Sequence, residues 1–258
     1  MLRLGVRAEL VASSARVAIR RAASLGFGAV QLTARGELHP DELSHTGRRD
    51  LRHYLAAHGL SLSGWFYPMR YGLGEQIELE RRLDELRKTL QMAFETGAGC
   101  VVTAIGRIPS DAEHPARQLL QEVVADLGAY ADHVGAVLAV ETGTEPGEVL
   151  AEFLAALDCG SVRVNFDPAA LRIKGYDPLA AFEALVEFIV HCHAWDATID
   201  AASETGQVVA LGKGIVPWPE IQRLLQEAAY QGWVIVDQLP SSGPTAAEAA
   251  LQYLRSIG

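Results

Sequence analysis

The segment Phe188–Asp196 reads FIVHCHAWD, a short apolar run that ends in two histidines, a tryptophan and an aspartate. In an extended strand alternate side chains share a face, so His191, His193 and Trp195 are expected to point the same way. Taken alone, the segment fits two interpretations. It is a buried strand with hydrogen-bonded core histidines, or one whose imidazoles hold a metal or a substrate.

The same alternation of a short apolar strand and an amphipathic helix recurs along the whole chain without a low-complexity linker. Eight such units in about 250 residues predict an α/β fold, a single (β/α)8 TIM barrel that occupies 1–258 as one domain. The competing open sheet would carry a glycine-rich phosphate loop after its first strand, and Arg7–Ser14 has none. The other expected strands are Leu2–Arg7, Ala29–Leu32, Leu60–Phe66, Cys100–Ile105, Ala136–Val140, Val162–Phe166 and Trp233–Val236.

Composition narrows the classes of function. The net charge of −10 argues against binding to a phosphate backbone, which requires clustered Lys and Arg. No apolar run approaches the roughly 18 residues of a membrane span, and the first residues lack the apolar core of a secretory signal. The three cysteines are scattered, as is typical of buried thiols in a reducing cytosol. We therefore expect a cytoplasmic protein that acts on small molecules, and a homo-oligomer is compatible with the sequence.

In a barrel of this type the active site lies at the C-terminal ends of the strands. In the second half of the chain these ends carry Glu141, Asp167, His193 and Asp237. Each of these carboxylates, taken alone, is also typical of a turn or of a helix N-cap. Three carboxylates and an imidazole at one rim would repel each other unless a cation lay between them. This oxygen-rich set with one nitrogen suits Mn²⁺, with Mg²⁺, Co²⁺ or Zn²⁺ as alternatives.

Five motifs occur in an order and spacing that resemble the xylose-isomerase-like TIM barrels. This family includes sugar-phosphate isomerases and epimerases, ketose 3-epimerases, inosose dehydratase and isomerase, and a branch of DNA-repair endonucleases. The resemblance covers most of the chain. The motifs are VLAVETG (137–143), VRVNFDP (162–168), IVHCHAWD (189–196), LGKGIVPWPEI (211–221) and AAYQGWVIVDQ (228–238).

The resemblance implies that Glu141, Asp167, His193 and Asp237 bind one divalent metal, and that Glu141 and Asp237 form the acid/base pair. It implies a metal-dependent sugar, keto-polyol or sugar-phosphate isomerase or epimerase that works through a stabilised enediolate. Three alternatives stay open: a dehydratase or lyase acting on an inosose or keto-sugar with the same site, a metal-impaired barrel that only binds sugar, and an abasic-site endonuclease. The last needs more histidine ligands and a basic surface, which this sequence lacks.

Candidate substrate contacts are more varied. Tyr67 and Trp195 are expected to stack on a sugar, and Trp65 either stacks on it or packs at the rim. Asp196 and His191 complete the candidate substrate contacts. His191 lies deeper in the strand, where it either supports the ligands or belongs to the core. The segment from residue 196 to 214 is read as a polar loop that closes over the substrate.

The chain departs from its relatives at several positions. The eighth strand usually ends in Glu, and Asp237 is one methylene shorter. The other substitutions are Ala170 for His or Asn, Trp195 for Lys, Gln31 for Glu and Lys213 for Glu.

Overall fold

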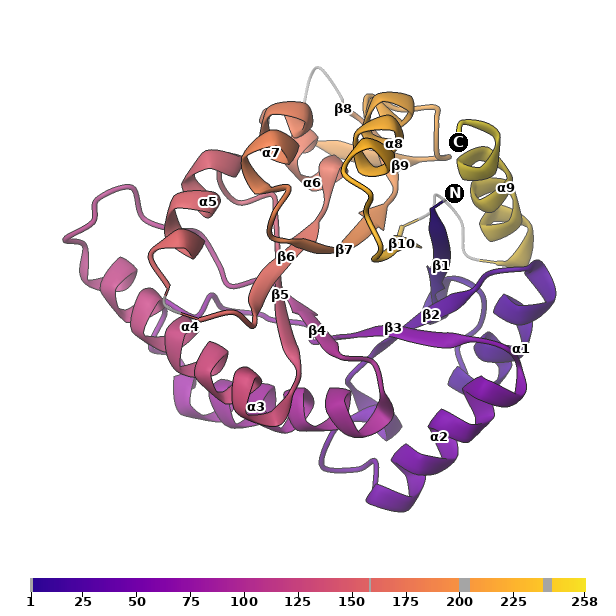
Figure 1. The fold of residues 1–258 in the computed structure, drawn as a ribbon, viewed down its shortest axis with the longest axis horizontal. Helices are drawn as coiled ribbons and strands as arrows, with labels where there is room; N and C mark the ends of the chain where they lie inside the picture. The colour runs from indigo at the N-terminus through magenta and orange to yellow at the C-terminus, as the bar shows by residue number, and fades with distance from the viewer. Residues whose placement is uncertain (1, 158, 200–204, 239–242) are drawn as a thin grey trace.

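The barrel predicted from the sequence is confirmed by a computed structural model, which describes residues 2–157, 159–199, 205–238 and 243–258. Eight parallel strands close into a ring in the order β1-β10-β7-β6-β5-β4-β3-β2, with helices around the outside (Figure 1). The strands are short and mostly buried, because both of their faces are covered. The barrel strands are β1 (Arg3–Arg7), β2 (Ala29–Thr33), β3 (Ser61–Phe66), β4 (Cys100–Thr103), β5 (Val137–Glu141), β6 (Val162–Phe166), β7 (Ile189–Ala194) and β10 (Trp233–Val236).

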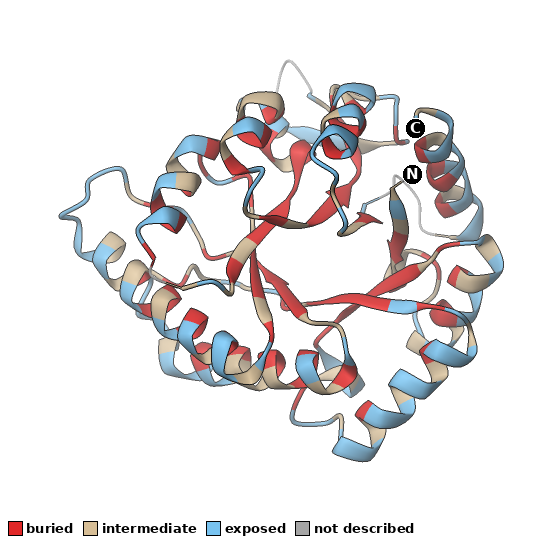
Figure 2. Ribbon diagram, in the orientation of Figure 1, coloured by how far each residue is buried: buried red, intermediate tan, exposed pale blue. Residues whose placement is uncertain are grey.

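The helices turn an apolar stripe toward the strands and a polar face toward solvent (Figure 2). Several of them end in a glycine with left-handed backbone, such as Gly26 and Gly97, which is a common helix stop. In the described residues no helix combines the length and apolar character that a bilayer crossing needs. The helices are α1 (Ala15–Leu25), α2 (His45–Ala57), α3 (Leu79–Thr96), α4 (Pro115–Val134), α5 (Gly147–Ala155), α6 (Pro168–Ile173), α7 (Pro178–Leu185), α8 (Trp218–Glu227) and α9 (Pro244–Ser256), with short 3₁₀ turns η1 (Ala8–Leu10) and η2 (Gly36–Leu38).

Two segments differ from the sequence expectation. Asp167-Pro168 resembles a simple turn, yet it begins the short helix α6, with Asp167 accepting from the backbone N–H of Ala170 as its N-cap. The segment after β7, expected to be an open loop, contains the antiparallel strands β8 (Asp196–Ile199) and β9 (Gly206–Val209). The central part of the expected lid, 200–204, lies outside the described residues.

Two irregularities interrupt the regular pairing of the barrel. The register of β2 against β3 shifts between Val30 and Gln31, and that of β6 against β7 shifts between Val164 and Asn165. Bulges of this kind are common beside active sites because they re-aim side chains. Gln31 and Asn165, the residues at these shifts, both turn out to contact the same histidine.

Asp196 ties the start of the β8–β9 hairpin to the segment that follows it. Its side chain is fully buried, and its two oxygens accept from the backbone N–H groups of Ala197, Gly212, Gly214 and Val216 at 2.9–3.2 Å. A Cβ at Gly214 would lie 2.0 Å from Oδ1 of Asp196. Only glycine at position 214 therefore allows the backbone to approach this carboxylate so closely.

We expect Asp196→Ala to lower the free energy of unfolding by roughly 3 kcal/mol, because four backbone N–H groups, two of them in buried hydrogen bonds, lose a charged acceptor. Asp177→Ala is the matched control, since Asp177 caps α7 from an exposed position through one N–H, and its loss should cost about 1 kcal/mol. Urea unfolding followed by circular dichroism measures both. Equal losses in the two variants would contradict the bracing role of Asp196.

Candidate functional site

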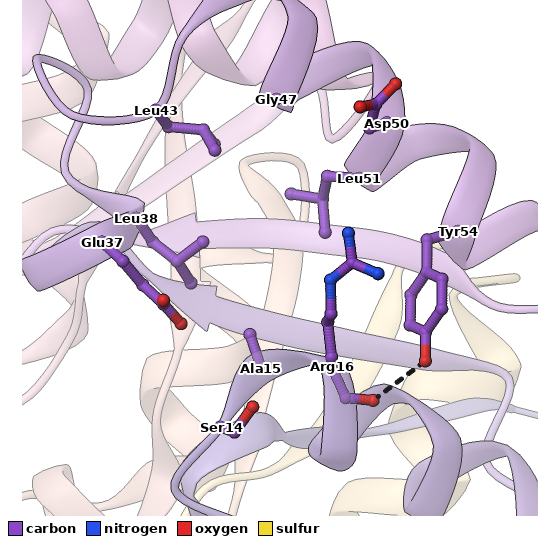
Figure 3. A pocket seen from close by; sticks show the side chains of 10 residues that line it. All are labelled: Ser14, Ala15, Arg16, Glu37, Leu38, Leu43, Gly47, Asp50, Leu51 and Tyr54. Carbon is purple, nitrogen blue, oxygen red and sulfur yellow. Dashed lines mark hydrogen bonds between the residues drawn. The ribbon is translucent and has the colours of Figure 1, made fainter.

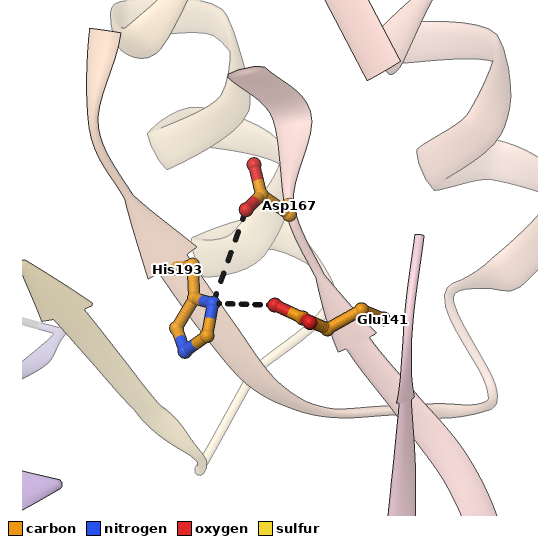
Figure 4. A group of neighbouring side chains, drawn as sticks. All are labelled: Glu141, Asp167 and His193. Atoms are coloured by element: carbon orange, nitrogen blue, oxygen red, sulfur yellow. Dashed lines mark ion pairs between the residues drawn. The ribbon is translucent and has the colours of Figure 1, made fainter. Parts of the chain in front are cut away.

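The four residues expected at the rim lie at the C-terminal ends of neighbouring strands. Glu141 is the last residue of β5, Asp167 follows β6, His193 lies near the end of β7, and Asp237 follows β10. Parallel strands bring these positions to one end of the barrel. Figure 4 shows Glu141 and Asp167 directed at the same imidazole nitrogen.

That nitrogen is Nδ1 of His193. It lies 3.2 Å from Oε1 of Glu141, 3.9 Å from Oδ2 of Asp167 and 3.8 Å from Oδ2 of Asp237. The His193 side chain is fully buried, whereas the Glu141 side chain keeps 20% of its surface exposed. Glu141 is therefore the member of this cluster most open to a molecule entering from the rim.

The imidazole of His193 is fixed from both sides. Its Nε2 lies 3.0 Å from Oε1 of Gln31, and its Nδ1 lies 3.0 Å from Nδ2 of Asn165. As assigned from this network, Nε2–H donates to Gln31, and Nδ1 accepts from Nδ2–H of Asn165 on the side of the ring where the carboxylates lie. A histidine that binds a metal commonly donates its other N–H to such an oxygen.

His191 lies behind this group rather than beside it. It is buried, and its Nδ1 donates to Oδ1 of Asn165 at 2.8 Å, which orients the Asn165 amide toward His193. Burial, helped by the neighbouring charge of His193, lowers the pKa of His191 well below its ordinary value. His191 is thus a neutral supporting residue, as the depth of its position in the strand indicated.

Asp167 is held by three N–H contacts on its two oxygens. Trp195 Nε1–H lies 2.9 and 2.8 Å from Oδ1 and Oδ2, and the Ala170 N–H donates to Oδ1. Burial raises the pKa of Asp167 to about 7, although His193 and the Trp195 donor act in the opposite direction. Trp195 therefore positions a carboxylate here.

The charges around His193 are strongly coupled. Burial alone would lower the pKa of His193, but the carboxylates of Asp237, Glu141 and Asp167 outweigh burial and raise it. An imidazole in this setting attracts a cation to its Nδ1 side, whether a proton or a metal ion.

The ligand atoms of Glu141, Asp167 and His193 lie within 4.8 Å of one another. Around a Mg²⁺ or Mn²⁺ ion with bonds of about 2.1 Å, octahedral ligand atoms are about 3 to 4.2 Å apart. The distances from Nδ1 to Glu141 and Asp167 fall in this range. Two carboxylates and one imidazole nitrogen without a hydrogen thus fit a hard divalent cation.

Asp237 differs from the other three. Its Oδ1 forms an ion pair with Nη1 of Arg7, the last residue of β1. Its oxygens do not join the set of ligand atoms found within 4.8 Å of one another among the described residues. Asp237 therefore faces His193 on one side and a guanidinium on the other.

Three of the expected substrate contacts lie away from this cluster. Trp65 is fully buried and donates to Oγ1 of Thr96 on α3 at 2.9 Å, so it belongs to the packing between strand and helix. The hydroxyl of Tyr67 lies 2.5 Å from Glu85 on α3, and burial raises its pKa. The Asp196 oxygens accept hydrogen bonds from backbone N–H groups, as described above. None of these side chains is free to stack on or hydrogen-bond a substrate beside His193.

Two residues of the site were not singled out in the sequence. Asn165 lies two positions before Asp167, near the C-terminal end of β6, which is a usable signal. The signal in the sequence for Arg7 is weaker. This residue ends the first strand, and in a closed barrel the first strand pairs with the last, which ends at Asp237.

A hollow of about 260 Å³ lies elsewhere, between the start of α1 and α2 (Figure 3). Arg16, Glu37 and Tyr54 line it, and the Tyr54 hydroxyl donates to the backbone oxygen of Arg16 at 3.4 Å. It includes none of the four rim residues.

Known proteins resemble this chain in both sequence and fold. Inosose dehydratase of Lacticaseibacillus casei is 26% identical over 121 residues, which are 42% of this chain and 39% of that enzyme. The chain thus matches well under half the length of this curated relative.

Solved structures match over almost the full length. A xylose isomerase domain protein from Planctomyces limnophilus superposes with a TM-score of 0.88 at 23% identity, covering 99% of this chain and 97% of the other. D-Psicose 3-epimerase from Clostridium cellulolyticum H10 gives 0.80 at 15% identity, covering 99% of each chain. The family model for the xylose isomerase-like TIM barrel matches residues 19–257. The chain belongs to the xylose isomerase-like TIM barrel family.

Proposed function

We propose that the chain is a divalent-metal-dependent isomerase or epimerase that moves a proton beside the carbonyl of a sugar or keto-polyol. The observation that carries this proposal is the convergence of Glu141, Asp167 and Asp237 on the Nδ1 lone pair of His193. Such a cluster both binds a cation and supplies carboxylates for proton transfer. We take the metal to be Mn²⁺, bound at the cluster of Glu141, Asp167, His193 and Asp237.

The cation, when bound, would stabilise the negative charge that develops on the substrate oxygens as the carbon-bound proton leaves. Glu141 is suited to be the base because it is the most exposed carboxylate of the cluster. Asp167 is unsuited to that role because three N–H contacts hold its oxygens in place. Asp237, whose Oδ2 lies 3.8 Å from the same nitrogen, is the second carboxylate that we assign to proton return.

A dehydratase is the second candidate, favoured by the sequence similarity to an inosose dehydratase. The first step would be the same removal of a proton by Glu141. The outcome then depends on whether a hydroxyl on the adjacent carbon leaves before the proton returns, with Asp237 placed to donate to it.

The first test is metal binding. Protein stripped with a chelator and titrated with Mn²⁺ should bind about one ion per chain, and His193→Ala combined with Asp167→Ala should abolish this binding. Glu145→Gln is the control, because Glu145 is a buried rim carboxylate that bonds Thr144 and the Ile108 N–H instead of the cluster. A wild-type chain that takes up no Mn²⁺ at millimolar concentration would refute the metal site.

The second test detects the chemistry without knowing the product. Ketoses, their phosphates, inososes and 3-keto-glycosides are incubated in D₂O with Mn²⁺ and followed by NMR and mass spectrometry. A true substrate should gain deuterium beside its carbonyl, and Glu141→Gln should slow this uptake roughly 10²–10⁴-fold. Loss of water from the product would identify the dehydratase. Uptake that persists unchanged in Glu141→Gln would remove Glu141 from the reaction.

The third test addresses the orientation of His193. Gln31→Met keeps the volume of the side chain but removes the oxygen that accepts from Nε2–H. We expect Mn²⁺ affinity to fall about 10–100-fold, as is typical when the partner of a metal-binding histidine is lost. Gln222→Met, a change at a buried glutamine on α8, is the control. Equal affinities in wild type and Gln31→Met would show that Gln31 does not orient the ligand.

A further inference from the structure

Arg7 reaches the site because the barrel closes. β1 pairs with β10 in a register that joins Val6 to Val236, so the next residues on the two strands, Arg7 and Asp237, emerge side by side at the rim. The backbone N–H of Asp237 also bonds the oxygen of Ala194 on β7. The ion pair between Arg7 and Asp237 is therefore set by strand register rather than by a mobile loop.

Two further contacts, with an aromatic ring and a second carboxylate, hold the guanidinium of Arg7. It lies over the ring of Phe66 at 3.9 Å from the ring centroid, and its Nε is 3.8 Å from Oε2 of Glu9. Its side chain is mostly buried, and that of Asp237 is only 4% exposed. A stacked, partly desolvated guanidinium is a strong partner for a carboxylate, since little water competes with it.

This partner competes with a metal ion for Asp237. Oδ1 faces Arg7, and Oδ2 lies 3.8 Å from Nδ1 of His193, but Asp237 does not join Glu141, Asp167 and His193 in the group whose ligand atoms all lie within 4.8 Å of one another. The aspartate is also one methylene shorter than the glutamate found here in the relatives that the sequence resembles. A carboxylate already neutralised by a guanidinium gains less from a cation, and the guanidinium itself repels that cation.

We propose that Arg7 is a positioning residue that holds Asp237 out of the metal-ligand set. The centre then has three protein ligands, Glu141, Asp167 and His193, and Asp237 remains beside it as a carboxylate paired with Arg7. The assignment rests on the proposed function, because it presumes a cation at these three ligands. A site with three protein ligands leaves more of the coordination sphere open to substrate oxygens than a four-ligand site does.

The test compares ligand sets without a substrate. Mn²⁺ affinity is measured by titration, and the absorption spectrum of bound Co²⁺ reports the number and geometry of its ligands. Asp237→Asn should keep the Co²⁺ spectrum of wild type and weaken Mn²⁺ binding by no more than about fivefold, the effect of one nearby charge. Asp167→Asn should weaken binding by more than about a hundredfold, since a ligand is lost.

Arg7→Met should free Asp237 to join the ligands. We expect a changed Co²⁺ spectrum and Mn²⁺ binding at least about tenfold tighter, because a ligand is added and a positive charge removed. The double variant Arg7→Met/Asp237→Asn should return to the spectrum of Asp237→Asn. Arg3→Met is the matched control, since Arg3 lies on the same strand and stacks on Trp233 at 4.0 Å, away from the rim.

Loss of Mn²⁺ in Asp237→Asn to the extent seen in Asp167→Asn would overturn the three-ligand assignment while leaving the proposed function intact. An Arg7→Met spectrum identical to wild type would overturn it too. If Arg7→Met does not fold, the comparison of Asp237→Asn with Asp167→Asn still decides. A wild-type chain that binds neither ion would overturn the proposed function and this assignment together.

Discussion

Three carboxylates face one nitrogen of a fully buried imidazole, and this concentration of negative charge is the constraint around which the rim is arranged. Buried like charges are costly unless a cation or donors offset them. In this structure each of the three carboxylates has its negative charge offset in a different way. Asp167 receives N–H donors, Asp237 receives a guanidinium, and Glu141 stays partly exposed. The three carboxylates of one cluster thus have three different chemical environments.

The fold supplies those differences through strand register. The shifts at Gln31 and Asn165 bring two amides to opposite sides of His193, and barrel closure brings Arg7 to Asp237. Each of these partners comes from a different strand, so the site forms only when the whole ring is closed. Its stability and its geometry therefore depend on the same pairings.

Local patterns were enough to predict the barrel and the positions of Glu141, Asp167 and His193. Apolar runs mark the strands, and a polar residue at the end of such a run marks the rim. The pairing of Arg7 with Asp237 is not local, because it depends on which residues meet when β1 reaches β10. Nor does a sequence pattern reveal a bulge, or the hydrogen bonds that turn Trp65 and Tyr67 toward α3. The expected stacking role failed for these two aromatics because residue type alone does not fix the side of a strand.

The two flanks of the rim also differ in what they present to a substrate. Beyond β6, the position that carries His or Asn in relatives is Ala170, and a Cβ at the facing Gly143 would lie 2.7 Å from its methyl group. The backbone of Gly143 therefore approaches Ala170 too closely for a side chain at position 143 without movement. Beyond β1, Arg7, Glu9 and Phe66 form a charged and aromatic wall beside Asp237. Polar partners for a substrate are therefore concentrated on the β1 side, next to the carboxylate that the guanidinium holds. Asp237 and Arg7 thus act as one unit, in which a fixed guanidinium offsets the charge of a buried acid beside the cluster.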